Sequence, residues 1–157
     1  MSTANIEQQA FDAWDKGELA QAFDLFSQAV ALGLDGCMIN LGYFHDEGIG
    51  TVQDKEKAMY WYKRAYRKGD SAAASNIAIL YRERLRFRQS FQWFERAAEM
   101  GDGDAALELA KLYLTGTGVR RSSSGAVRCL QNALSSTHIT EAGREEARGL
   151  LDEKIAL

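Results

Sequence analysis

The chain has 157 residues, of which 46% are hydrophobic and 26% charged, and its formal net charge at pH 7 is -3. This composition supplies enough apolar surface for a core, which excludes a disordered chain, and no apolar run approaches the ~20 residues of a membrane span. The N-terminal segment MSTANIEQQAFDAWDKGE lacks a basic start followed by an apolar stretch, so we expect no signal peptide, no membrane association and a cytoplasmic location.

The first predicted elements are two helices at about 4–15 and 19–32, joined by the turn DKGE. The next pair is predicted at about 36–47 and 55–68. In its second helix, four residues recur at i, i+3, i+4 and i+7, which is the spacing of a helix face and not of a strand: Ala58, Trp61, Tyr62 and Ala65.

The third pair is predicted at about 71–84 and 87–100, and its second helix matches the second helix of the preceding pair with an offset of 32 residues. WYKRAYRKGDSAAASNIAILY, which starts at Trp61, matches WFERAAEMGDGDAALELAKLY, which starts at Trp93, at bulky, small and turn positions together. A fourth pair is predicted at about 104–115 and 123–135, with Cys129 in the place of the tryptophan. A final amphipathic helix at about 139–155 has apolar residues on one side, Ala142 and Leu150 among them, which could cover the end of the fourth pair.

Glycines mark the boundaries of these elements. Gly33, Gly69 and Gly101 fit the position just after a helix, with Asp70 and Asp102 placed to cap the next helix. Two connecting loops carry Gly-x-Gly, whose glycines can adopt the positive φ that ends a helix: Gly48 with Gly50, and Gly116 with Gly118. The loop after Tyr81 is four residues shorter and has no glycine pair.

The chain therefore contains four similar units, at about 4–33, 36–69, 70–101 and 102–136, with spacings of 36, 32 and 36 residues. Periods between 20 and 50 residues indicate stacked supersecondary units. We expect residues 1–157 to form a single all-α domain, an α-solenoid of about four antiparallel helix pairs with the helix at 139–155 as its C-terminal cap.

The segment LGYFHDEGIGTVQDKEKAMYWYKRAYRKGD, from Leu41 to Asp70, resembles the Sel1-like repeat family, a relative of the tetratricopeptide repeat. It departs from the family's pattern at His45, usually a tyrosine, and at Val52, often a proline. The first unit is more similar to a tetratricopeptide repeat, and the third has a loop of tetratricopeptide length. The resemblance covers about residues 4–136, and it implies a helical solenoid that holds other proteins and has no common catalytic residues.

The residues themselves indicate no catalytic or metal site. His45 occupies an aromatic core position, and His138 lies in a polar linker without a partner at metal-ligand spacing. Cys37 and Cys129 are expected to be buried free thiols. Phosphate-binding loops need a strand and a lysine that are missing here. We therefore expect a protein that is not an enzyme and uses no cofactor. The alternative is a hydrolase or nucleotide enzyme, which detectable turnover of a substrate would support.

In helix-pair solenoids the first helix of each pair lines the concave face, which usually carries the ligand contacts. The first-helix positions expected to be exposed there include aromatic residues and arginine, the types that anchor interfaces: Glu7, Phe11, Trp14, Ile39, Tyr43, Asp46, Ser75, Ile79, Arg82, Leu107, Lys111 and Leu114. A second interpretation places Phe11 and Trp14 in the core of the first unit.

Charge is unevenly distributed. Residues 1–53 hold eight acidic residues and one basic residue, whereas residues 54–96 hold eleven basic and five acidic residues. The basic patch expected from this segment consists of Lys63, Arg64, Arg67, Lys68, Arg84, Arg86 and Arg88. It favours an acidic protein or peptide partner. Nucleic acid is disfavoured by the acidic ends and by the lack of exposed aromatics among the arginines.

These observations predict a non-catalytic protein–protein interaction module, an adaptor or scaffold that binds a protein or peptide on its concave face, as a monomer or weak homodimer. The narrower alternative is a bacterial immunity protein that neutralises a toxin made by the same cell. This alternative depends on a resemblance to short Sel1-like chains that occur in pairs of a toxin and its immunity protein.

Overall fold

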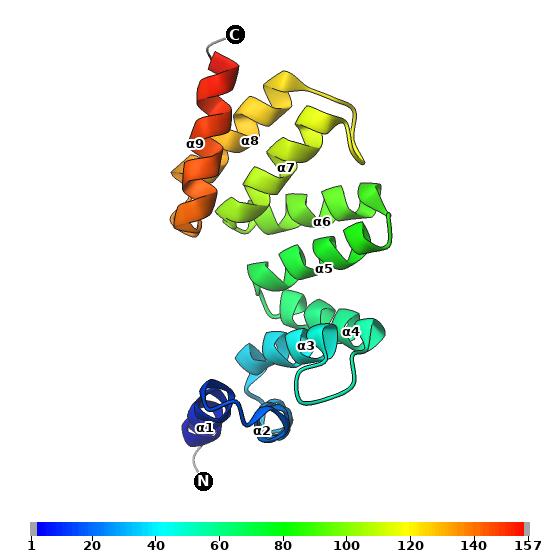
Figure 1. The fold of residues 1–157 in the computed structure, drawn as a ribbon, viewed down its shortest axis with the longest axis vertical. Helices are drawn as coiled ribbons and strands as arrows, with labels where there is room; N and C mark the ends of the chain where they lie inside the picture. The colour runs from blue at the N-terminus through cyan, green and yellow to red at the C-terminus, as the bar shows by residue number, and fades with distance from the viewer. Residues whose placement is uncertain (1–2, 156–157) are drawn as a thin grey trace. The chain divides into compact units, whose positions relative to one another are not determined.

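The computed structural model describes residues 3–155 and divides into two compact units, Met1–Ala73 and Ala74–Leu157. The first unit contains α1 (Thr3–Asp15), α2 (Leu19–Ala31), a short 3-10 helix (Asp35–Cys37), α3 (Met38–Glu47) and α4 (Lys55–Arg67). α5 (Ser71–Glu83) begins at the end of this unit (Figure 1). The second unit continues with α6 (Phe87–Glu99), α7 (Gly103–Thr115), α8 (Ser123–Ser135) and α9 (Glu141–Ile155).

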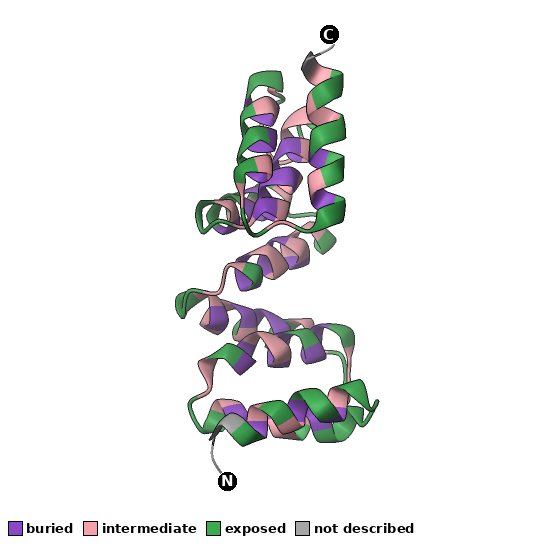
Figure 2. Cartoon of the chain, turned by 90° about the vertical axis from the view of Figure 1, so that its left-hand side faces the viewer, coloured by how far each residue is buried: buried purple, intermediate pink, exposed green. Residues whose placement is uncertain are grey.

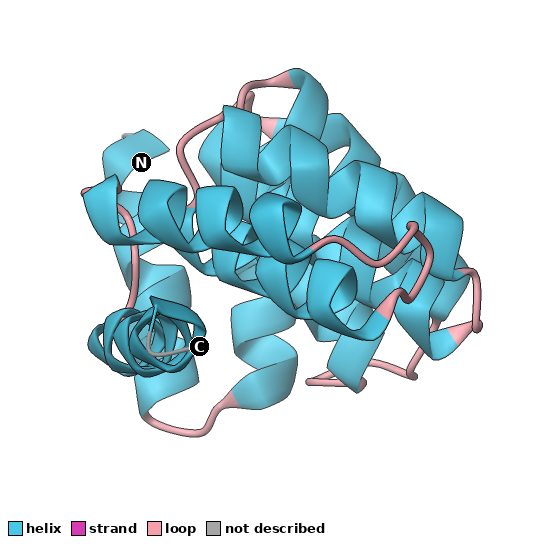
Figure 3. Cartoon of the chain, turned by 90° about the horizontal axis from the view of Figure 1, so that it is seen from above, coloured by secondary structure: helices cyan, strands magenta, loops and turns pink. Residues whose placement is uncertain are grey.

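The all-α prediction is confirmed for the described part of the chain, where every regular element is helical (Figure 3). The only strand-like feature between residues 3 and 155 is an isolated bridge between Asp102 and His138. The helices begin and end within three residues of the predicted positions. The largest differences are the 3-10 turn that precedes α3 and the start of α9 at Glu141, where Thr140 accepts a hydrogen bond from the Gly143 N–H at 3.0 Å.

The predicted helix caps are confirmed. Asp70 accepts a hydrogen bond from the Ala73 N–H at 3.1 Å, and Asp102 accepts one from the Ala105 N–H at 3.0 Å. Gly33, Gly69 and Gly101 all have positive φ. Each cap supplies an acceptor to backbone N–H groups that have no partner within their own helix, so these turns are specified by local sequence.

The second glycine of each Gly-x-Gly loop lies against the backbone at the start of another helix. A Cβ atom on Gly50 would lie closer than 3.0 Å to the Leu19 carbonyl oxygen, and a Cβ on Gly118 equally close to that of Phe87. The positive φ of both glycines agrees with the sequence prediction. The close backbone contact was not predicted, and it places each loop directly against a helix of its own unit.

The core of the first unit is aromatic. Phe26, Phe44 and Tyr62 are fully buried, and the Tyr62 ring lies directly against Gly42, where a Cβ atom would collide with it. His45 is buried as expected, with its ring edge-on to Phe23 at 5.3 Å between centroids. Burial lowers the pKa of His45, with a smaller contribution from Lys57.

The core of the second unit is built from α5 to α9, and buried and exposed residues alternate along these helices (Figure 2). Ala147 is fully buried on α9, whereas Ala142 is exposed, so the predicted contact face of α9 is wrong at that position. The difference follows from the start of the helix. Asp104 on α7 accepts hydrogen bonds from the Thr140 N–H and hydroxyl at 2.9 and 2.7 Å, which turns Gly143 toward α7.

Leu85 is the one non-glycine residue with positive φ in the described chain, at 58°. It occupies the turn between α5 and α6, and the turn between α1 and α2 has Gly17 at φ 76° with the same backbone hydrogen bonds. Because Leu85 is 74% exposed, glycine there would lose little packing and relieve the left-handed backbone strain. We expect Leu85→Gly to raise the free energy of unfolding by about 1 kcal/mol.

Equilibrium urea unfolding measures this effect. The reciprocal change, Gly17→Leu, should lower the free energy of unfolding by a similar amount, since no atom lies within 4 Å of the added Cβ and only the backbone is strained. A Leu85→Gly protein that is less stable than the native chain would show that the leucine side chain stabilises the fold by more than its positive φ destabilises it.

Candidate protein-binding surfaces

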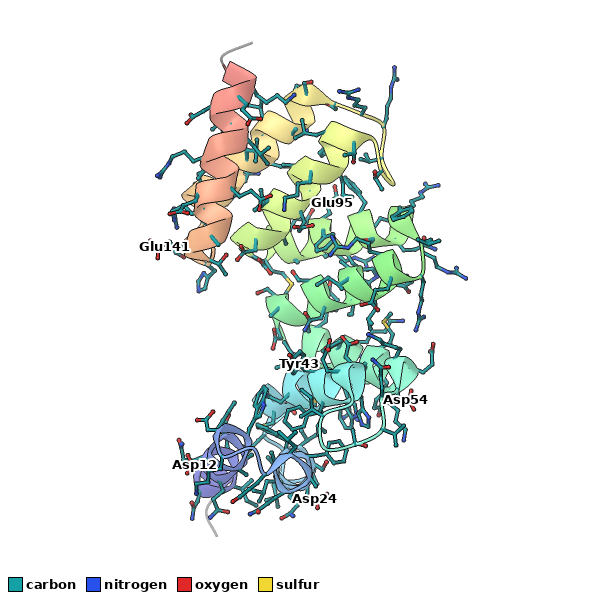
Figure 4. All side chains as sticks on the ribbon, viewed as in Figure 1. Asp12, Asp24, Tyr43, Asp54, Glu95 and Glu141 are labelled. Carbon is teal, nitrogen blue, oxygen red and sulfur yellow. The ribbon has the colours of Figure 1, made fainter. Side chains whose placement is uncertain are left out.

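An exposed aromatic surface lies on the first helices of the first unit, α1 and α3. It consists of Phe11, Trp14 and Tyr43, and Figure 4 labels Tyr43 on α3. The Phe11 and Trp14 rings stack with 6.4 Å between centroids, and Trp14 lies 5.9 Å from Tyr43. Phe11 is 36% exposed and Tyr43 39%. The structure therefore brings together Phe11 and Trp14 of the first repeat and Tyr43 of the second.

The aromatic surface is supported by the core beneath it. Trp14 packs edge-on against Phe26 at 6.2 Å and against Phe44 at 4.9 Å. Phe11 packs edge-on against Phe26 at 5.1 Å. One side of each ring therefore contacts the core, while Phe11 is also exposed. This packing fixes the rings in place and reduces the entropy lost on binding.

Ile39 is half-buried, one helical turn before Tyr43 on α3. The predicted exposure of Asp46 is wrong, since its carboxylate is buried. It accepts a hydrogen bond from the Tyr62 hydroxyl at 3.0 Å and forms an ion pair with Lys55. A carboxylate so engaged inside its own unit is poorly placed to contact a partner.

In the second unit, the predicted residues Arg82 and Lys111 join through a residue that was not predicted. Arg82 pairs with Glu108 at 2.8 Å, and Lys111 pairs with the same carboxylate at 3.1 Å. Lys111 also pairs with Glu146 of α9 at 2.8 Å. Burial acts to lower the pKa of Lys111, but the hydrogen bonds to Glu146 and Glu108 outweigh it and raise the pKa above its usual value.

This network ties three helices of the second unit together and partly neutralises the positive charge expected of Arg82 and Lys111. The spacing of Glu108 and Lys111 at i and i+3 was a sequence signal for one of its pairs. Two apolar residues predicted beside it, Ile79 and Leu114, are half-buried. The expected exposure of Leu107 is wrong, because its side chain is buried in the core.

The predicted basic patch is divided among different environments. On α4, Arg64 donates to the Tyr60 hydroxyl at 2.8 Å and lies over the Trp61 ring at 5.4 Å, while Lys68 pairs with Asp35 at 3.0 Å. The remaining members are Lys63, half-exposed on α4, and Arg67, exposed at its end. Arg84 and Arg86 are exposed in the turn between α5 and α6, and Arg88 is exposed at the start of α6.

Cys37 and Cys129 are free and buried, as predicted. Burial raises the pKa of Cys37 to about 11, helped by the Glu7 carboxylate. Burial also raises the pKa of Cys129. Both therefore remain neutral thiols near pH 7. Among the residues described, no group of three or more His, Cys, Asp or Glu side chains could hold a metal ion, and no helix is long and apolar enough to cross a membrane.

Comparison with known proteins places these features in a family. The Sel1 repeat family model matches residues 17–34, 36–70, 85–102 and 103–138, well over half of the chain. A Sel1 repeat protein from Oxalobacter formigenes has a similar fold, with a TM-score of 0.78 and 22% identity over 97% of this chain and 63% of that one. A protective antigen of uropathogenic Escherichia coli with an SLR fold has a TM-score of 0.69 and 27% identity, over 85% of this chain and 33% of the antigen.

A chitin synthase regulator from Malassezia restricta is 37% identical over 60 residues, which are 38% of this chain and only 4% of the regulator. The chain thus spans a small part of this relative. Sel1 repeat proteins are generally non-catalytic scaffold modules for protein–protein interaction. The four matched repeats and the all-α solenoid fold of the similar structures establish that this chain belongs to the Sel1 repeat family.

Proposed function

We propose that this protein is a non-catalytic adaptor that holds a partner protein or peptide on the aromatic surface formed by Phe11, Trp14 and Tyr43. The observation that carries the proposal is the continuity of these rings. The Trp14 ring joins Phe11 to Tyr43, both of which keep more than a third of their surface in solvent. Aromatic residues held by a core are the usual anchors of protein interfaces.

The charges beside this surface suggest what the partner carries. Asp12 and Asp15 are exposed on α1 next to Phe11 and Trp14, so an apolar side chain with a basic neighbour would fit there. Arg67, which is exposed at the end of α4, would attract an acidic segment of the same partner, raising the association rate more than the affinity.

A crosslinking experiment tests the proposal. A photoreactive phenylalanine at position 43 should crosslink to one protein in the native host, which mass spectrometry then identifies. Binding of that purified protein should weaken at least about tenfold in Tyr43→Ala or Phe11→Ala, the typical effect of losing an interface anchor. Tyr60→Ala is the matched control, because Tyr60 is an exposed aromatic residue on the second helix α4.

If Tyr43→Ala binds the partner as tightly as the native chain, the aromatic surface is not the binding site. The role as an immunity protein is a narrower form of the same function, in which the partner is a toxin. Coexpression of the chain with the product of a neighbouring gene tests it, and failure to rescue growth from that product would contradict it.

A further inference from the structure

The second unit contains an open pocket of about 540 Å³ that the surfaces described above do not use. Its walls are α6, with Glu95 and Ala98, and α8, with Cys129 and Asn132. Its floor is α7, where Ala106 and neighbouring apolar residues lie. Figure 4 labels Glu95 on α6 beside this region. A pocket of this size holds a large side chain with room to spare.

The same position is filled in the first unit. The two units correspond at an offset of 68 residues: Gly50 contacts Leu19 as Gly118 contacts Phe87. This offset places Cys129 where the first unit has Trp61, which packs against the aromatic core. It also places Asn132 where the first unit has Arg64, whose guanidinium lies 5.4 Å from the centre of the Trp61 ring.

At two further positions of the pocket, the side chain is smaller than its counterpart in the first unit. Ala106 corresponds to Met38, which is buried in the first unit, and Ala98 corresponds to Val30, which packs against the core there. The third repeat keeps the tryptophan and arginine pair, with Arg96 lying 4.4 Å from the centre of the Trp93 ring. The pocket is therefore the space that an indole and its stacked guanidinium occupy in the second and third repeats.

The charged side chains around the pocket favour a positively charged group next to any aromatic ring that enters it. Glu95 and Glu99 are exposed on the α6 wall, and Asp102 also lines the pocket. Arg128 on α8 is the opposing positive charge. A basic group that enters next to an aromatic ring would therefore meet carboxylates on the α6 side, where it would be attracted.

We propose that this pocket binds a tryptophan side chain of a partner protein, with an adjacent arginine or lysine facing Glu95 and Glu99. The partner thereby supplies the pair of side chains that the second and third repeats carry where the fourth has Cys129 and Asn132. The inference rests on the proposed function of holding a protein. The pocket lies in the second unit and is separate from the aromatic surface formed by Phe11, Trp14 and Tyr43.

A labelled peptide with the sequence of residues 55–68 is a suitable probe, because it holds one tryptophan, six basic residues and one acidic residue. Fluorescence anisotropy should show saturable binding to the full chain. Replacing the peptide's tryptophan with alanine should weaken binding at least about tenfold, as for an interface anchor. The protein variant Cys129→Trp, which refills the pocket, should weaken it as much, whereas Cys129→Ala should bind within about twofold of the native chain.

Absence of saturable binding, or equal binding of the alanine peptide, would overturn the proposal. So would native affinity in Cys129→Trp. If that variant does not fold, Ala106→Met serves instead, since methionine occupies the corresponding position in the first unit and would fill the pocket floor. Tyr43→Ala should bind the peptide like the native chain, which separates failure of this proposal from failure of the aromatic surface.

Discussion

Replacing Gly118 with alanine should lower the free energy of unfolding by about 3 kcal/mol or more. The added Cβ would collide with the Phe87 carbonyl oxygen, which belongs to the backbone at the start of α6 and cannot rotate away as a side chain would. The residue also has a φ of 71°, which costs a non-glycine residue about 1 kcal/mol. Both effects strain the native state, and guanidinium unfolding monitored by circular dichroism measures their sum.

Gly101→Ala provides the matched control. Gly101 has a φ of 98°, but no atom lies within 4 Å of a Cβ placed there, so only the backbone strain remains. We expect Gly101→Ala to cost about 1 kcal/mol, and Gly50→Ala, which faces the Leu19 carbonyl, to cost as much as Gly118→Ala. Equal losses in Gly101→Ala and Gly118→Ala would show that the loop moves away from α6 at little cost.

The helices, their order and their ends could be predicted from the sequence because each depends on neighbouring residues. Repeated apolar spacing defined the helix faces, and Asp70, Asp102 and Gly101 defined the turns between them. The family resemblance also came from local motifs. These features are determined within a few residues along the chain, so three-dimensional information adds little to them.

The candidate site was only partly predictable. On a short helix, an error of about one residue in the assumed register exchanges buried and exposed positions. Asp46 is an example. It lies one position after the core residue His45, and it is buried because Tyr62 and Lys55 of the second helix reach it. The link from Lys111 to Glu146 joins residues 35 positions apart, which no local pattern indicates.

The pocket shows a different limit. Cys129 in the place of a tryptophan was visible in the sequence, but a smaller residue in a repeat is often compensated by larger neighbours. Whether Ala98 and Ala106 fill the space depends on which side chains meet across three helices. Packing volume is a property of the assembled helices, so the pocket could be found only in the structure.

Replacing Asp46 with alanine should lower the free energy of unfolding by about 3 kcal/mol. The substitution removes the acceptor of the Tyr62 hydroxyl, which is fully buried, and one partner of the Lys55 ammonium group. A buried hydroxyl without an acceptor keeps the full cost of its lost hydration. Asp24→Ala is the control, since Asp24 is exposed on α2 (Figure 4) and its removal should change stability by less than about 0.5 kcal/mol.

A double variant identifies the source of the loss. Tyr62→Phe removes the hydroxyl that Asp46→Ala would strand, so the two changes together should cost at least about 1 kcal/mol less than the sum of the single losses. Urea unfolding of the four proteins gives this coupling energy directly. If the single losses add without coupling, the Asp46 carboxylate stabilises the unit through Lys55 alone, and the hydrogen bond to Tyr62 contributes nothing measurable.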